Sequence, residues 1–224
     1  MIDALLNFDF MRYSLISGIL IGFIAPFIGA FIVVRRLSLI ADALSHVTLG
    51  GISFGMFLIT IIPTAALINP MWFGVLFAIV GALLIEKLRT TFSNYQEIAI
   101  PIIMSSGVAL SAIFISLADG FNQEIVGLLF GSISAVSLSD MITIIIIVII
   151  VTIFILSLYK ELFVLSFDDE YSKVIGLPKW IQFLFIAIVA MVISASMRVI
   201  GILLVSALIT LPISIAMRIT KGFK

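Results

Sequence analysis

The sequence predicts an all-α integral membrane protein, folded as a single membrane domain over residues 1–224 with about seven transmembrane helices. Of the 224 residues, 63% are hydrophobic and only 11% are charged, and the mean hydropathy is +1.38. About a quarter of the residues of a soluble domain are charged, so this composition excludes a soluble fold. A transmembrane helix needs about 20 apolar residues, and such segments recur along the whole chain.

Seven apolar segments account for the predicted transmembrane helices: residues 13–34, 37–61, 71–85, 98–117, 141–158, 181–197 and 199–217. The first is uncharged, and the arginine pair Arg35–Arg36 separates it from the second. Pro63 and Pro70 end the second, because proline cannot donate the backbone hydrogen bond that continues a helix. The third ends at a charged run that begins with Glu86, and a polar link leads to the fourth.

The fifth segment is rich in isoleucine and valine and has no polar face, which indicates contact with lipid. Before it, residues 122–140 are amphipathic and too short to span, as expected of an interfacial or re-entrant segment on the outer side. The sixth segment follows a long polar connection, and Arg198 alone separates it from the seventh. The seven segments would then cross the membrane in alternating directions.

The 12 basic residues are distributed unevenly between the two sides of the membrane. All except Arg12 and Arg198 lie in or beside the connections that follow the first, third, fifth and seventh segments. Because basic residues gather in cytoplasmic loops, we expect the N-terminus outside and the C-terminus in the cytoplasm. The outer connections carry mainly acidic residues, and a negative face attracts cations.

Several classes of function are excluded by residues that the sequence lacks. There are no cysteines, so neither disulfides nor thiolate metal sites can form. No basic stripe of the kind that binds nucleic acid is present. The sequence also has no phosphate-binding loop of the Walker A type, so the chain cannot itself be an ATPase. We therefore predict no catalytic residues in this chain.

The second segment carries an ionisable pair, Asp42 and His46, and His46 is the only histidine of the chain. Residues four apart share one face of a helix, so the two side chains can converge on one point. Counted from Arg36, His46 would lie about 15 Å deep, near the middle of the bilayer. Ionisable groups at membrane depth are costly and mark functional sites. A carboxylate and an imidazole here indicate a pathway for a cation.

Two ligands cannot hold a metal ion alone, but a two-fold dimer with this face on its axis would supply two aspartates and two histidines. Such nitrogen and oxygen ligands suit zinc, manganese or ferrous iron and do not suit copper(I), which prefers sulfur. Two other interpretations stay open. The pair could relay protons, or His46 could bond a neighbouring helix while Asp42 reaches toward the arginines at the interface.

The longest cytoplasmic connection, residues 159–180, contains a predicted short helix. Its capping carboxylates, apolar stripe and terminating residues are, in order, Asp168, Asp169, Tyr171, Val174, Ile175, Gly176 and Pro178. Either aspartate can cap the N-terminus, the next three residues share one face, and glycine followed by proline ends the helix. The apolar stripe could dock in a groove of a soluble partner, or the helix could lie on the membrane surface.

Several stretches, in this order, resemble the permease subunit of bacterial ABC importers for zinc, manganese or iron. They are RRLSLIADALSH at 35–46, GLLFGSISAVS at 127–137, and FDDEYSKVIGLP at 167–178 followed by RVIGILLVSALITLPISIA at 198–216. The resemblance covers nearly the whole chain and implies a type II ABC-importer-like fold in a multi-pass protein of the bacterial cell membrane. It also implies that Asp42 and His46 line the metal path and that the segment from Asp168 to Pro178 is the helix that couples to the ATPase.

The resemblance further implies that the chain is a transport subunit, not an enzyme, of an ATP-driven importer of divalent transition metal ions. Its partners would be a second permease copy (a homodimer, occasionally a heterodimer), cytosolic ATPase subunits, an extracytoplasmic metal-binding protein and the lipid bilayer, with no nucleic acid. No cofactor is expected to be bound permanently, because zinc, manganese or iron is the cargo. The family has about one more transmembrane helix after LLVSALITLP at 203–212, so we expect this chain to lack the family's last helix.

The alternative function is a secondary transporter or channel in which Asp42 and His46 relay protons or cations. Many secondary transporters contain inverted internal repeats, and the sequence has no such repeat. Uptake that follows the proton gradient would favour this alternative, whereas uptake that stops when the partner ATPase is inactivated would favour the importer.

Overall fold

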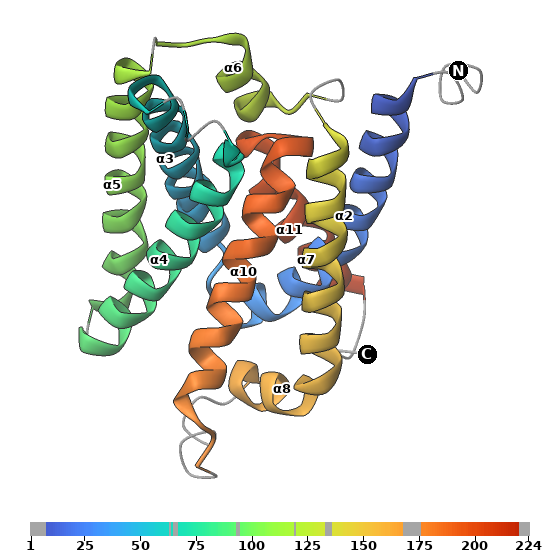
Figure 1. Ribbon diagram of the computed structural model, residues 1–224. Helices are drawn as coiled ribbons and strands as arrows, with labels where there is room; N and C mark the ends of the chain where they lie inside the picture. The colour runs from blue at the N-terminus through green and yellow to red at the C-terminus, as the bar shows by residue number, and fades with distance from the viewer. Residues whose placement is uncertain are drawn as a thin grey trace.

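The computed structural model describes residues 8–62, 64, 67–92, 95–118, 120–132, 136–167 and 176–219. Over these residues the chain contains nine α-helices and no β-strand (Figure 1). They are α2 (Asp9–Val34), α3 (Ile40–Ile61), α4 (Pro70–Thr91), α5 (Gln96–Leu117), α6 (Gln123–Phe130), α7 (Leu138–Ser157), α8 (Tyr159–Phe167), α10 (Lys179–Ile200) and α11 (Ile202–Ile219).

Seven of these helices, all except α6 and α8, are long and apolar enough to cross a membrane. They correspond one to one with the seven apolar segments of the sequence, which confirms the predicted fold class. Figure 1 shows the short helix α6 at one end of the bundle and α8 across the opposite end. The connections rich in basic residues lie at the α8 end, which is therefore the cytoplasmic end.

Several helices differ from the sequence prediction by a few residues at their ends, and three differences have a clear physical reason. Helix α4 continues to Thr91, past the charged run that begins with Glu86, because glutamate, lysine and arginine are good helix formers. Helix α10 includes Arg198 and stops at Gly201, whose φ of +84° suits glycine and breaks the chain into α10 and α11. The third difference is α8, since its residues were expected to belong to a polar connection.

Helix α3 lies inside the bundle, where it packs against α4 and α5 and also touches α10 and α11. Most of its side chains are buried, and several are small. A Cβ atom on Gly51 would lie only 2.5 Å from the carbonyl oxygen of Phe73 on α4, so a larger residue would force the two helices apart. The small residues of α3 therefore allow the close helix packing typical of membrane proteins.

The outer ends of four helices meet at buried charges. The Asp140 carboxylate, in the first turn of α7, is completely buried and lies 3.1 Å from Nε of Arg198 on α10. The amide of Asn69, which caps α4, donates to Asp140 over 3.4 Å. Glu124 of α6 lies 3.8 Å from the same arginine. These contacts fix the outer ends of α4, α7 and α10 relative to one another.

Candidate functional site

Asp42 and His46 lie on α3 and are both half-buried. Their neighbours Ala41, Ala43 and Leu44 are completely buried, so the pair occupies a narrow strip that the described residues of this chain leave uncovered. Leu39, one turn before Asp42, belongs to the same strip and is 63% exposed. An aspartate and a histidine are thus accessible in the cytoplasmic half of α3, where the other side chains of the helix are buried.

The pair lies nearer the cytoplasm than the sequence predicts. The residues between Arg36 and Ile40 are not helical, so α3 begins only at Ile40. His46 is six residues further on, which is about 9 Å along the helix axis instead of about 15 Å. Asp42 lies in the first turn of α3. The two side chains therefore occupy the cytoplasmic half of the span.

Further toward the outer side, α5 covers the same face of α3. A Cβ atom on Gly50 would lie 3.4 Å from the carbonyl oxygen of Gly107, and Ser53 is buried. The ring of Phe57 then meets that of Phe114, with 6.0 Å between the ring centroids. The accessible part of the strip therefore ends near His46, and the outer half of this face is packed against a neighbouring helix of the same chain.

The described residues of one chain do not assemble a complete metal site. Within them, no group of three or more histidine, aspartate, glutamate or cysteine side chains is close enough to hold an ion. Asp42 and His46 supply one oxygen and one nitrogen ligand, and zinc or manganese requires at least four ligands in total. The remaining ligands would have to come from beyond the described part of this chain.

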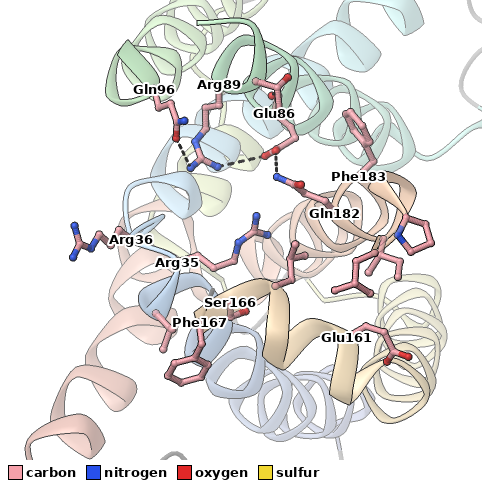
Figure 2. A pocket seen from close by; sticks show the side chains of 16 residues that line it. Arg35, Arg36, Glu86, Arg89, Gln96, Glu161, Ser166, Phe167, Gln182 and Phe183 are labelled. Atoms are coloured by element: carbon pink, nitrogen blue, oxygen red, sulfur yellow. Dashed lines mark hydrogen bonds and ion pairs between the residues drawn. The ribbon is translucent and has the colours of Figure 1, made fainter. Parts of the chain in front are cut away.

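A second feature is a cavity of about 650 Å³ at the cytoplasmic end, between the ends of α2, α4, α8 and α10 (Figure 2). The carboxylate of Glu86 lies on its wall and is only 1% exposed. The side-chain amide of Gln182 donates a hydrogen bond to this carboxylate, and Arg89 forms an ion pair with it over 3.4 Å. Arg89 also donates to Gln96 over 3.4 Å.

Sequence reasoning missed this polar network, because its carboxylate and its amide are 96 residues apart. In the sequence, Glu86 is simply the first residue of a charged run, and Gln182 is the one polar residue of an apolar helix start. The only signal was the position of the glutamate, which falls directly after an apolar stretch instead of inside a polar loop.

Of the predicted coupling residues, the structure describes Gly176 and Pro178. Gly176 has a φ of +72°, the conformation of a helix-ending glycine, and Pro178 is the N-cap residue of α10. The other five candidates lie outside the described residues: Asp168, Asp169, Tyr171, Val174 and Ile175. Phe167 and Leu177 both line the cytoplasmic cavity.

The comparisons with known proteins give one consistent result. The ABC 3 transport family matches residues 7–224. A probable metal transport system membrane protein of Treponema pallidum is 30% identical over 221 residues, which cover 98% of this chain and 79% of that protein. The manganese transport system membrane protein MntC of Listeria monocytogenes is 32% identical, over 98% of this chain and 76% of its own length.

The fold has a solved counterpart. The structure of PsaBC from Streptococcus pneumoniae in complex with Fab superposes with a TM-score of 0.81 and 28% sequence identity. The superposition covers 99% of this chain and 77% of that chain. The similarity therefore extends over all seven candidate membrane spans.

Proposed function

This chain belongs to the ABC 3 transport family, and from that membership we propose that it carries manganese inward as the permease of an ATP-driven importer. The chain is a multi-pass membrane permease subunit of a metal ABC transport system, and it is not an enzyme. The secondary transporter or channel that the sequence left open is not favoured by these relatives.

Manganese is the proposed cargo because MntC, 32% identical, is a manganese transport protein. Asp42 and His46 offer carboxylate oxygen and imidazole nitrogen, and manganese accepts both. Zinc and ferrous iron accept the same ligands, so the chemistry of this pair does not separate them. A competition assay among manganese, zinc and ferrous iron would determine the order in which the permease prefers them.

The observation that carries the proposal is the half-buried Asp42–His46 pair in the otherwise buried cytoplasmic half of α3. We propose that a second copy of the chain places the same strip opposite, so that two aspartates and two histidines surround the ion between the copies. The cytoplasmic half of this α3 face is accessible, whereas α5 covers its outer half. This arrangement favours an ion path that follows the boundary between the two copies.

The energy would come from partner subunits, because this sequence contains no Walker A loop. We propose that two cytosolic ATPase subunits bind the segment from Asp168 to Pro178. An extracytoplasmic metal-binding protein would deliver the ion to the negatively charged outer face. Gly176 and Pro178 connect that segment directly to α10. A movement of the bound ATPase would therefore be transmitted to α10 without a long flexible linker between them.

The test is uptake of ⁵⁴Mn²⁺ into proteoliposomes that contain the permease with its ATPase, with the metal-binding protein supplied on the extracytoplasmic side. We expect uptake that requires ATP and stops when the ATPase carries an inactivating substitution. Excess unlabelled Mn²⁺ should compete, whereas Mg²⁺ should not, because Mg²⁺ prefers an all-oxygen shell. Uptake that is independent of ATP and follows an imposed proton gradient would contradict the proposal.

A further inference from the structure

Glu86 is an acidic residue of α4 that the proposed metal path does not use. Its carboxylate is 1% exposed at the cytoplasmic end of the helix. Burying a carboxylate is costly unless hydrogen bonds and opposite charges compensate it. Here Gln182, in the first turn of α10, and Arg89, one turn further along α4, provide that compensation (Figure 2). The contact between Glu86 and Gln182 therefore ties α10 to α4.

The outer ends of the same two helices are tied as well. Arg198, in the last turn of α10, lies 3.1 Å from the buried Asp140 carboxylate. Asn69, the N-cap of α4, donates to the other oxygen of that carboxylate over 3.4 Å. Helices α4 and α10 also pack against each other. A direct contact at the cytoplasmic end, and a contact through Asp140 of α7 at the outer end, thus hold α4 and α10 at a fixed relative position.

Helix α4 in turn lies directly against α3. A Cβ atom on Gly51 of α3 would lie 2.5 Å from the carbonyl oxygen of Phe73 on α4. A Cβ atom on Gly81 of α4 would lie 2.9 Å from the side chain of Val47, the residue that follows His46. At Gly51 the two backbones are in direct contact, and at Gly81 only the short side chain of Val47 lies between them, so a shift of α4 must move α3.

We infer that α4 and α10 move as one rigid unit, and that the Glu86–Gln182 contact passes a displacement of the cytoplasmic end of α10 to the Asp42–His46 helix. Glu86 and Gln182 are then positioning residues for transport, because they touch neither the ion nor the nucleotide. The inference rests on the proposed function, since it needs an ATPase that acts on the chain segment preceding α10. It adds the route by which that action reaches α3.

The test uses the permease with its ATPase in liposomes, with the metal-binding protein supplied on the extracytoplasmic side, and measures both ATP hydrolysis and ⁵⁴Mn²⁺ uptake. Gln182→Glu places two carboxylates opposite each other and breaks the contact. We expect ATP hydrolysis within about twofold of wild type but at least about fivefold less Mn²⁺ moved per ATP. Glu86→Gln alone keeps an amide hydrogen bond to Gln182 and should stay coupled. The exchanged pair Glu86→Gln/Gln182→Glu restores an amide opposite a carboxylate and should recover the ratio.

A matched control is Gln96→Ala, which removes another polar partner of Arg89 at the same cavity without touching α10. Its uptake per ATP should equal that of wild type. If Gln182→Glu cannot be purified, the apolar pair Glu86→Leu/Gln182→Leu replaces it, because it removes the hydrogen bond without leaving a buried charge. That pair should show the same loss of uptake per ATP.

An unchanged ratio in Gln182→Glu or in the leucine pair would overturn the inference. An equal loss of hydrolysis and uptake that the exchanged pair does not repair would also overturn it, since that is the result expected of general misfolding. Failure of the proposed function is a different result: the wild-type complex would then show no ATP-dependent uptake at all.

Discussion

Asp42 and His46 are the two side chains that α3 leaves half-buried in its cytoplasmic half. Within the described residues, neither forms a hydrogen bond or an ion pair. An ionisable group at membrane depth is costly to keep without a partner, so its presence favours a ligand that arrives from elsewhere. A transported cation would provide both the charge and the coordination that the pair lacks within the described residues of one chain.

His46→Ala and Asp42→Ala should each abolish Mn²⁺ uptake without reducing the amount of protein in the membrane. Removing a polar group lowers the cost of membrane insertion, so a loss of uptake reflects the missing ligand. His46→Gln should keep some packing but coordinate poorly. Leu39→Ala, on the same strip, is the control and should transport normally. Normal transport by His46→Ala would mean that the histidine serves only packing.

Arg198→Met should destabilise the protein by about 3 kcal/mol, because it leaves the completely buried Asp140 carboxylate without its cation. Arg12→Met is the matched control, since the Arg12–Asp9 pair is exposed at the same end of the bundle and should contribute less than about 1 kcal/mol. Thermal unfolding of the two variants in one detergent gives the comparison. Equal shifts would contradict the structural role of the buried pair.

Glu86 illustrates what residue patterns cannot predict. Hydropathy identified the glutamate as the beginning of a charged run, but its hydrogen-bond partner is 96 residues away on another helix. Such a contact depends on how α4 and α10 pack, and no local pattern encodes it. The Asp42–His46 pair was predictable because a single helix carries both residues four positions apart.

Helix α3 depends on small residues to lie between α4 and α5. Gly51→Ala should cost about 1–3 kcal/mol, because the added Cβ atom would meet the backbone of α4 at 2.5 Å. Gly18→Ala on α2 is the control: nothing lies within 4 Å of its added Cβ atom, and alanine favours a helix over glycine. The thermal unfolding temperature in detergent should fall for Gly51→Ala and should stay the same or rise for Gly18→Ala. The opposite order would contradict the close α3–α4 contact.

The predicted coupling segment, residues 168–178, can be tested for binding to the ATPase. Val174→Asp/Ile175→Asp should prevent recovery of the ATPase in a pull-down from detergent, because charges on the apolar stripe oppose docking in an apolar groove. Asp42→Ala is the control and should recover the ATPase as well as wild type does. Full recovery with the double variant would place the docking surface elsewhere on the cytoplasmic side, for example at residues 86–97.

Long apolar helices were predictable because lipid requires each one to satisfy its own backbone hydrogen bonds. Their ends were less predictable: α4 passes through its charged run, and the break at Gly201 depends on a backbone conformation. Helix α8 escaped prediction because it is short and lies beside polar residues, whereas its buried Leu162 and Leu165 show that tertiary packing stabilises it.

In the whole molecule, the polar groups give different helices different roles. Helix α3 carries the candidate ligands, α4 and α10 are tied at both ends, and α5 covers the outer half of the ligand face. One chain offers an incomplete metal site within its described residues. We propose that the second copy of the permease supplies the other two ligands.

The central claim is that one metal ion lies between two copies of this chain and is bound by Asp42 and His46 of each. Electron paramagnetic resonance of Mn²⁺ bound to the purified permease–ATPase complex, with ¹⁵N-labelled histidine, tests it most directly. We predict one Mn²⁺ for every two permease chains. We also predict a coupling to imidazole nitrogen that disappears in His46→Ala. One Mn²⁺ per chain, or a nitrogen coupling that survives in His46→Ala, would contradict the claim.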